Sequence, residues 1–237
     1  MSERTSGAAM PGLLSSAWLI ARKDLAIEFR TRSAFFSTLV FALLAIVIFF
    51  FAWDPTAVAA SDLAPGVLWV IFTFSGLLGL HRSFGVELAD RALDGLLGAP
   101  IPRHAIYLGK AMANLVFVLA IEVIAVPAVA LFYDMPLGGI SGVAALGALL
   151  VLAAIGLVTV GTLFAAMSVN TRLGELLLPM LSLPFFVPIV VPAAQTTARL
   201  LAGRPVVESI GWLKILVAFD LVFVAACTVA FPYTLED

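Results

Sequence analysis

The chain has 237 residues, of which 62% are hydrophobic and only 12% are charged. Soluble domains carry about 25% charged residues, so a water-soluble globule of this length could not cover its surface with so few ionised groups. The formal net charge of −2 gives no basic excess for nucleic acid, and a lone cysteine, Cys227, excludes an internal disulfide. The composition excludes a soluble enzyme and predicts a polytopic membrane protein.

The first part of the chain, residues 1–33, predicts a cytoplasmic segment with a helix lying on the membrane surface. Over residues 13–32, apolar side chains share one stripe at helical spacing: Leu14, Trp18, Ala21, Leu25 and Phe29. The alternative is that these residues form only the frayed start of the first membrane span.

Six windows are long and apolar enough to cross about 30 Å of hydrocarbon as helices. Each run is apolar on every face and does not alternate with a period of two, which disfavours strands. We predict an all-α fold, with one six-helix transmembrane domain over residues 34–232 and a short tail, 233–237. The predicted spans are about 34–53, 63–81, 105–132, 139–167, 176–194 and 212–231.

Lys and Arg residues are concentrated at one end of the predicted bundle. Five precede the first span and four surround the connection after the second span, whereas the connections after the first and third spans hold none. Because positive charge is retained in the cytoplasm, we expect both termini and the connection after the second span to be cytoplasmic. Arg199 and Arg204 depart from this rule and fall on the predicted outer side.

The connection after the second span contains a short amphipathic sequence that ends at Pro100 and Pro102. Placed on a helix, its charged and apolar residues separate onto two faces: Glu87, Asp90, Arg91 and Asp94 against Leu88, Ala89, Ala92, Leu93 and Leu96. We predict a helix over 86–97 that lies parallel to the membrane. Its acidic face suits a basic partner surface better than anionic lipid. The alternative is a solvated loop helix with incidental charge.

This connection carries a family resemblance. The run F-x-x-[DE]-L-x-D-x-x-L-[DE]-x-L-L-x-x-P-x-P resembles the haem exporter protein B family (CcmB), the membrane subunit of the cytochrome c maturation ABC system. The residues that carry it are Phe84, Glu87, Leu88, Asp90, Leu93, Asp94, Leu96, Leu97, Pro100 and Pro102. LAPGVLWV at 63–70, GKA at 109–111 and LPFFVP at 183–188 also fit, so the resemblance covers roughly residues 18–232. Arg91 stands where the family usually has Gly, and Gly95 where a larger residue is common.

The resemblance implies an ABC-2-type, type V exporter-like permease subunit in the cytoplasmic (inner) membrane. Its implied partners are a second copy of itself, a cytosolic ATPase of the CcmA type, membrane subunits of the CcmC and CcmD types, and a haem chaperone of the CcmE type. Residues 86–97 would be the coupling helix on the ATPase, made by Glu87, Leu88, Asp90, Arg91, Leu93, Asp94, Leu96 and Leu97 before Pro100. The implied function is either export of haem or release of haem-loaded chaperone.

Nothing in the sequence provides for nucleotide chemistry in this chain. No G-x-x-x-x-G-K-[ST] loop occurs, so ATP would be hydrolysed by a partner subunit. We expect no catalytic residue, no metal and no bound cofactor, with haem as cargo. His81 and His104 lie at the predicted cytoplasmic edge, where interfacial side chains are commoner than haem ligands.

Polar residues inside the predicted spans are candidates for function. Glu122 lies in mid-span, where a carboxylate costs about 3 kcal/mol, so we expect it to face the bundle interior and to serve packing, subunit contact or conformational switching. Asn114, two turns earlier, could share a polar seam with it. Asp220 is a second carboxylate inside a predicted span and is a candidate for the same kinds of role. The alternative is that its carboxylate snorkels or pairs with Lys214.

Prolines interrupt two of the predicted spans. The fifth span carries Pro179, Pro184, Pro188 and Pro192, and Pro127 lies in the third. Because each proline removes a backbone hydrogen bond, the fifth span is either a bendable hinge or a static kinked helix.

Two other functional classes stay open at this stage. Glu122 could drive a proton-coupled secondary transporter, which would work without ATP. Alternatively, Glu122 with Asp220 could belong to an intramembrane enzyme, although that chemistry needs converging polar groups and the sequence offers no evident nucleophile.

Overall fold

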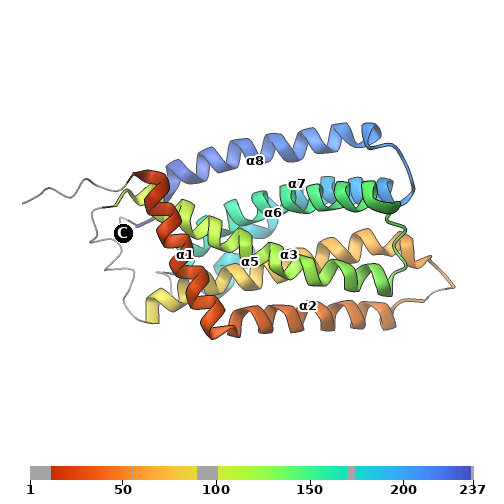
Figure 1. The fold of residues 1–237 in the computed structure, drawn as a ribbon, viewed down its shortest axis with the longest axis horizontal. Helices are drawn as coiled ribbons and strands as arrows, with labels where there is room; N and C mark the ends of the chain where they lie inside the picture. Colours follow the sequence, from red (N-terminus) through yellow and green to blue (C-terminus); the bar gives the residue numbers. More distant parts are fainter. Residues whose placement is uncertain (1–11, 55, 90–100, 170–173, 236–237) are drawn as a thin grey trace, which may run out of the picture.

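The computed structural model describes residues 12–54, 56–89, 101–169 and 174–235, with side chains for these except 82–89, 169, 174–178 and 235. Its helices form an elongated bundle (Figure 1). They are α1 (Leu13–Thr31), α2 (Ser33–Ala52), α3 (Ala60–Ala89), α5 (Arg103–Phe132), α6 (Gly139–Val169), α7 (Gly174–Leu201) and α8 (Ile210–Ala230), with 3-10 turns η1 (Val206–Ser209) and η2 (Phe231–Leu235). Within these ranges there is no strand, which confirms the all-α prediction.

Six helical segments are long and apolar enough to cross a membrane, as predicted. They are Ser33–Ala52, Ala60–His81, Arg103–Phe132, Gly139–Ser168, Pro179–Leu201 and Val206–Thr234, and each overlaps one predicted window. The fifth differs most, because α7 continues past the predicted end at 194. Its polar final turns are compatible with a buried helix because Thr197 accepts a hydrogen bond from the Trp69 indole and donates one to the Ala193 carbonyl, both 2.9 Å long.

The chain breaks sharply between α1 and α2. Arg32 adopts a left-handed conformation with φ 56°, and the Glu28 carboxylate accepts the Phe35 amide at 2.8 Å, which satisfies one amide in the first turn of α2. The α1 segment is therefore a separate helix and not the frayed start of the first span. In Figure 1, α1 (red) crosses one end of the bundle obliquely; we call this end the α1 end, and the other the opposite end.

The buried face of α1 differs from the predicted apolar stripe. Its buried residues are small or slender: Ser16, Ala17, Ile20 and Ala21. This face packs on α5. Only Ala21 of the predicted stripe belongs to it, whereas Leu14, Trp18 and Phe29 are exposed. The large apolar side chains of α1 thus point away from the bundle, where a surface helix would contact lipid.

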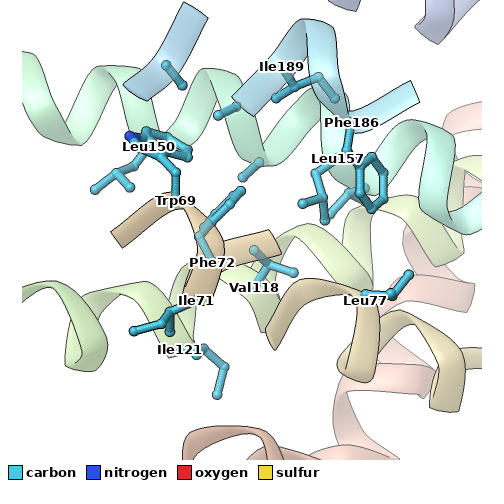
Figure 2. Close-up of a cluster of buried hydrophobic side chains, with 14 of the residues drawn as sticks. Trp69, Ile71, Phe72, Leu77, Val118, Ile121, Leu150, Leu157, Phe186 and Ile189 are labelled. Carbon is cyan, nitrogen blue, oxygen red and sulfur yellow. The ribbon is translucent and has the colours of Figure 1, made fainter. Parts of the chain in front are cut away.

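The core is centred on α6, which packs against α3, α5, α7 and α8. Figure 2 shows how side chains from four helices meet: Trp69 and Phe72 of α3, Leu150 and Leu157 of α6, Phe186 and Ile189 of α7, and Val118 and Ile121 of α5. Outward-facing side chains are also apolar, as on α2, where Leu44, Ile48 and Phe51 are exposed. An apolar exterior of this kind is expected where lipid is the solvent.

Gly109 sets the distance between α1 and α5. A Cβ atom at this position would lie 2.6 Å from the Ala17 carbonyl oxygen and 2.7 Å from the Ile20 Cβ atom. Since the Ala17 obstacle is backbone, it cannot move aside as a flexible side chain could.

We expect Gly109→Val to lower the free energy of unfolding by about 2 kcal/mol or more, because the added atoms push α1 off α5. Thermal unfolding of the detergent-purified protein measures this. The control is Gly147→Ala on α6, where a Cβ atom would meet nothing within 4 Å. A Gly109→Val protein as stable as the unmodified chain would contradict this packing.

Candidate functional site

A buried ion pair fastens α1 to the beginning of α5. The Lys110 side chain is fully buried, and its Nζ atom lies 3.3 Å from Oδ2 of Asp24. The Asp24 carboxylate, 17% exposed, also lies 3.1 Å from Nζ of Lys23. Because a buried ammonium needs an acid partner, Lys110 holds α1 in place beside the Gly109 contact. We call Asp24, Lys110 and Gly109 the α1 clamp.

The predicted coupling helix lies mostly outside the described residues. Of its residues, Glu87 and Leu88 fall in the last turn of α3. The others lie outside the described ranges: Asp90, Arg91, Leu93, Asp94, Leu96, Leu97 and Pro100. The amphipathic helix over 86–97 therefore stays a prediction. The structure does place the two ends of this connection, since α3 runs to Ala89 and α5 begins at Arg103, both at the α1 end (Figure 1).

The first turns of α5 also contact the C-terminal part of the chain. The His104 Nδ1 atom lies 2.8 Å from the Thr228 carbonyl oxygen of α8. The Tyr107 hydroxyl donates to the Thr159 carbonyl of α6 at 2.9 Å, and its ring packs on that of Phe231. Together with the α1 clamp, these contacts join the start of α5 to three other helices. A displacement of the α3–α5 connection would therefore be transmitted to α1, α6 and α8.

Asn114 and Glu122 do not share a polar seam. The Asn114 amide donates to the Thr162 hydroxyl of α6 at 3.0 Å. The Glu122 side chain is 6% exposed, and its Oε1 atom has no hydrogen-bond partner among the described residues. Glu122 thus faces the bundle interior, and the polar contact of Asn114 lies with α6.

Glu122 lines a small cavity between α3, α5 and α6. The cavity has a volume of about 20 Å³, and Leu68, Phe72 and Leu150 form part of its wall. Ser75 also lines it, and the Ser75 hydroxyl likewise lacks a partner among the described residues. The volume suffices for about one water molecule. In this structure the surroundings of Glu122 are therefore suited to a water or a proton and not to a larger substrate.

Asp220 points into the bundle from α8. Its side chain is 6% exposed, and neither carboxylate oxygen has a partner among the described residues. A Cβ atom on Gly156 of α6 would lie 2.5 Å from Asp220 Oδ1, so this glycine makes room for the carboxyl group. No described ion pair joins Asp220 to Lys214, which is exposed. The carboxyl neither snorkels nor pairs with Lys214 here.

The prolines are accommodated without breaking their helices. Pro179, Pro184, Pro188 and Pro192 all lie inside the continuous α7, and Pro127 lies inside α5. Because α7 keeps helical backbone through all four, the structure shows no interruption at the predicted hinge.

The two arginines that break the positive-inside pattern have local partners at the opposite end. Arg199 donates from Nη1 to the Glu208 carbonyl at 2.9 Å, and its guanidinium lies 5.9 Å from the Trp212 ring centre. The Arg204 Nη1 atom lies 3.7 Å from Glu208 Oε2. Glu208 and Trp212 therefore stabilise these cations at that end.

Several residues that position this site are not evident from the sequence. Gly109-Lys110 is visible there as a family feature, but its partners Ala17 and Asp24 are about 90 positions away. A signal did exist, because Lys110 is the one basic residue in the predicted window 105–132 and a buried lysine requires an acid. Nothing in the sequence indicates which acid.

For the α1 clamp, we expect Asp24→Leu to destabilise the protein more than Lys110→Met. Asp24→Leu removes the acid beside a fully buried ammonium, a loss of about 3 kcal/mol. Lys110→Met leaves Asp24 partly exposed and still beside Lys23, so its effect should be smaller. Thermal unfolding and tryptic cleavage near Arg32 measure the release of α1. The double variant should recover part of the loss, and equal effects of both single variants would contradict the assignment.

For Glu122, we expect replacement by methionine to raise the free energy of unfolding by about 1 kcal/mol, because an incompletely hydrogen-bonded buried carboxyl is exchanged for an apolar group. Glu122→Gln should not reproduce the gain. The control is Val123→Met on the exposed side of the same helix. A loss of stability in Glu122→Met would mean that the carboxyl is held by an interaction that the described residues do not supply.

Comparison with known proteins shows the family to which this chain belongs. The sequence matches the CcmB protein family over residues 15–237. A protein of Paracoccus denitrificans named heme exporter protein B is 32% identical over 208 residues, which covers 88% of this chain and 89% of the relative. Proteins of the same name from Rhodobacter capsulatus and Escherichia coli are 32% identical over 177 residues and 35% identical over 97 residues. The Rhodobacter capsulatus match covers 75% of this chain and 80% of the relative. The Escherichia coli match covers 41% of this chain and 44% of the relative. The bundle of six membrane-spanning helices with α1 across one end is thus that of a member of the CcmB family.

Proposed function

We propose that this chain is the non-catalytic membrane subunit of an ATP-driven export complex that serves haem traffic in cytochrome c maturation. The observation that carries the proposal is the family match over nearly the whole chain, together with relatives named heme exporter protein B. In this proposal the α1 end faces the cytoplasm, which agrees with the concentration of Lys and Arg residues there. ATP is hydrolysed by a separate ATPase subunit that docks on the connection between α3 and α5.

The way in which this connection is anchored supports its role in coupling. It joins two of the longest helices directly, and α5 begins only a few residues after the acidic sequence. Seven residues into α5 lies Lys110, whose contact with Asp24 makes α1 follow any movement of α5. An ATPase that pushes on residues 86–97 would therefore move α5 and α1 together, and through Tyr107 would reach α6.

The proposed complex contains a second copy of this chain, membrane subunits of the CcmC and CcmD types, and a haem chaperone of the CcmE type. In it, ATP hydrolysis drives either export of haem or release of the haem-loaded chaperone. The cavity at Glu122 accommodates only about one water, so a path for haem through a single copy would have to run elsewhere, as along the contact between two copies. Such a path would use the exposed apolar faces of the bundle.

The two other functional classes lack comparable support. An intramembrane enzyme built on Glu122 and Asp220 needs both groups in one site. Asp220 does not line the cavity at Glu122, and it faces Gly156 from another helix. A proton-coupled transporter would need a substrate site beside Glu122, where this structure leaves room for about one water.

We expect Asp90→Lys combined with Asp94→Lys to detach the ATPase subunit. The reason is that a basic face on residues 86–97 would be repelled by the basic partner surface expected on that subunit. The measurement is co-purification of the ATPase subunit with the tagged chain in mild detergent, with ATPase activity of the eluate as a second readout. Loss of most of the bound ATPase is the expected result.

The matched control is Asp54→Lys combined with Asp62→Lys, which makes the same charge change at the opposite end. This variant should retain the ATPase at the unmodified level. If both double variants retain it equally, the docking site on residues 86–97 is wrong. If the unmodified chain brings down no ATPase from its native membrane, the proposed function itself fails.

A further inference from the structure

A second, larger cavity lies at the opposite end of the bundle. It has a volume of about 180 Å³, is open on one side and is bordered by α6, α7, η1 and α8. Ala145, Ala148 and Leu152 of α6 face Leu200 of α7 and Leu213 of α8 across it. The alanines create the space, since larger side chains at these two positions would fill it. This cavity is about nine times larger than the one at Glu122 (180 against 20 Å³).

A shallow hollow on the outer surface of α8 adjoins the cavity. The two share Leu213 as a lining residue, and Lys214, Val217 and Leu221 also line the hollow. Val217 and Leu221 are 41% and 70% exposed, so they face the hydrocarbon when the bundle lies in a membrane. The cavity therefore lies beside a surface that acyl chains of the bilayer contact.

Three polar residues line the cavity: Thr196, Arg204 and Ser209. The Thr196 side chain is 7% exposed, and its hydroxyl has no hydrogen-bond partner among the described residues. Arg204 also lines the cavity, with 60% of its side chain exposed and a single long ion pair to Glu208 among those described. Arg204 thus places an accessible guanidinium beside walls that are mainly apolar.

The charge around the cavity favours an anion. All basic residues in the connections at the opposite end belong to one segment, 199–214, which contains Arg199, Arg204 and Lys214 with the single acid Glu208. Three positive charges and one negative charge leave a net +2.

We propose that this cavity binds one anionic phospholipid. An acyl chain occupies the space between α6, α7 and α8, and Arg204 binds the phosphate. Water is a poor occupant because the apolar walls offer too few hydrogen bonds for the several molecules that 180 Å³ would hold. Haem is also a poor occupant, because the described residues that line the cavity include no His, Met, Cys or Tyr for its iron.

The test uses the full-length chain purified in detergent and titrated with phosphatidylglycerol or phosphatidylcholine, with native mass spectrometry as the readout. We expect one phosphatidylglycerol to bind preferentially. Arg204→Gln should weaken its binding roughly 3- to 10-fold, the range for losing one partly exposed charge-assisted contact. Glu208→Gln should act in the opposite direction, since it removes the acid that competes for Arg204.

A steric pair of variants tests the position of the acyl chain. Ala148→Phe should abolish the bound lipid, whereas Ala144→Phe, one turn earlier on α6 and outside the cavity lining, should retain it. Size-exclusion chromatography checks that both variants are folded. Equal binding of the two lipids, equal retention in the two phenylalanine variants, or displacement of the lipid by haem would each overturn the proposal.

Discussion

Close approach at small residues is the constraint on which this bundle depends. In lipid there is no hydrophobic driving force between helices, so association relies on packing and on hydrogen bonds between them. Three glycines of this chain lie where neighbours come nearest: Gly76 receives Leu157, Gly156 receives Asp220, and Gly109 receives the backbone of α1. Each glycine brings a different pair of helices together. The central position of α6 follows, because two of these three contacts involve it.

Polar contacts between helices then fix the positions that packing allows. Trp69 with Thr197 joins α3 to α7, Asn114 with Thr162 joins α5 to α6, and Lys110 with Asp24 joins α5 to α1. The carboxyls of Glu122 and Asp220 differ from these pairs, because each has an oxygen without a hydrogen-bond partner among the described residues. Buried groups of this kind weaken a membrane bundle, so they are expected to persist where they serve a function. The structure thereby separates polar residues that hold the helices together from polar residues that do not.

Much of the fold could be predicted from hydropathy, because a span of hydrocarbon requires a long apolar run and only helices satisfy its backbone. The six spans are the clearest instance. The end of α7 was harder, since Thr196, Thr197 and Arg199 lower the hydropathy of a segment that is nevertheless helical. The hydrogen-bond partners of the polar residues could not be predicted. Asn114 and Glu122 share a helical face in the sequence, but which neighbour each one meets depends on tertiary packing. The predicted coupling helix over residues 86–97 rests on its amphipathic pattern and on the family resemblance, because most of it lies outside the described residues.

The ion pair between Asp24 and Lys110 also has a consequence for the order of assembly in the cell. Asp24 is made early, yet its partner emerges from the ribosome only after two membrane spans have been synthesised and the third has begun. Until then α1 has no docking surface, and its exposed leucine, tryptophan and phenylalanine side chains can rest only on lipid. Insertion of the third span would then recruit α1 onto the bundle, so that α1 reaches its final neighbours only after two spans that are translated later than it.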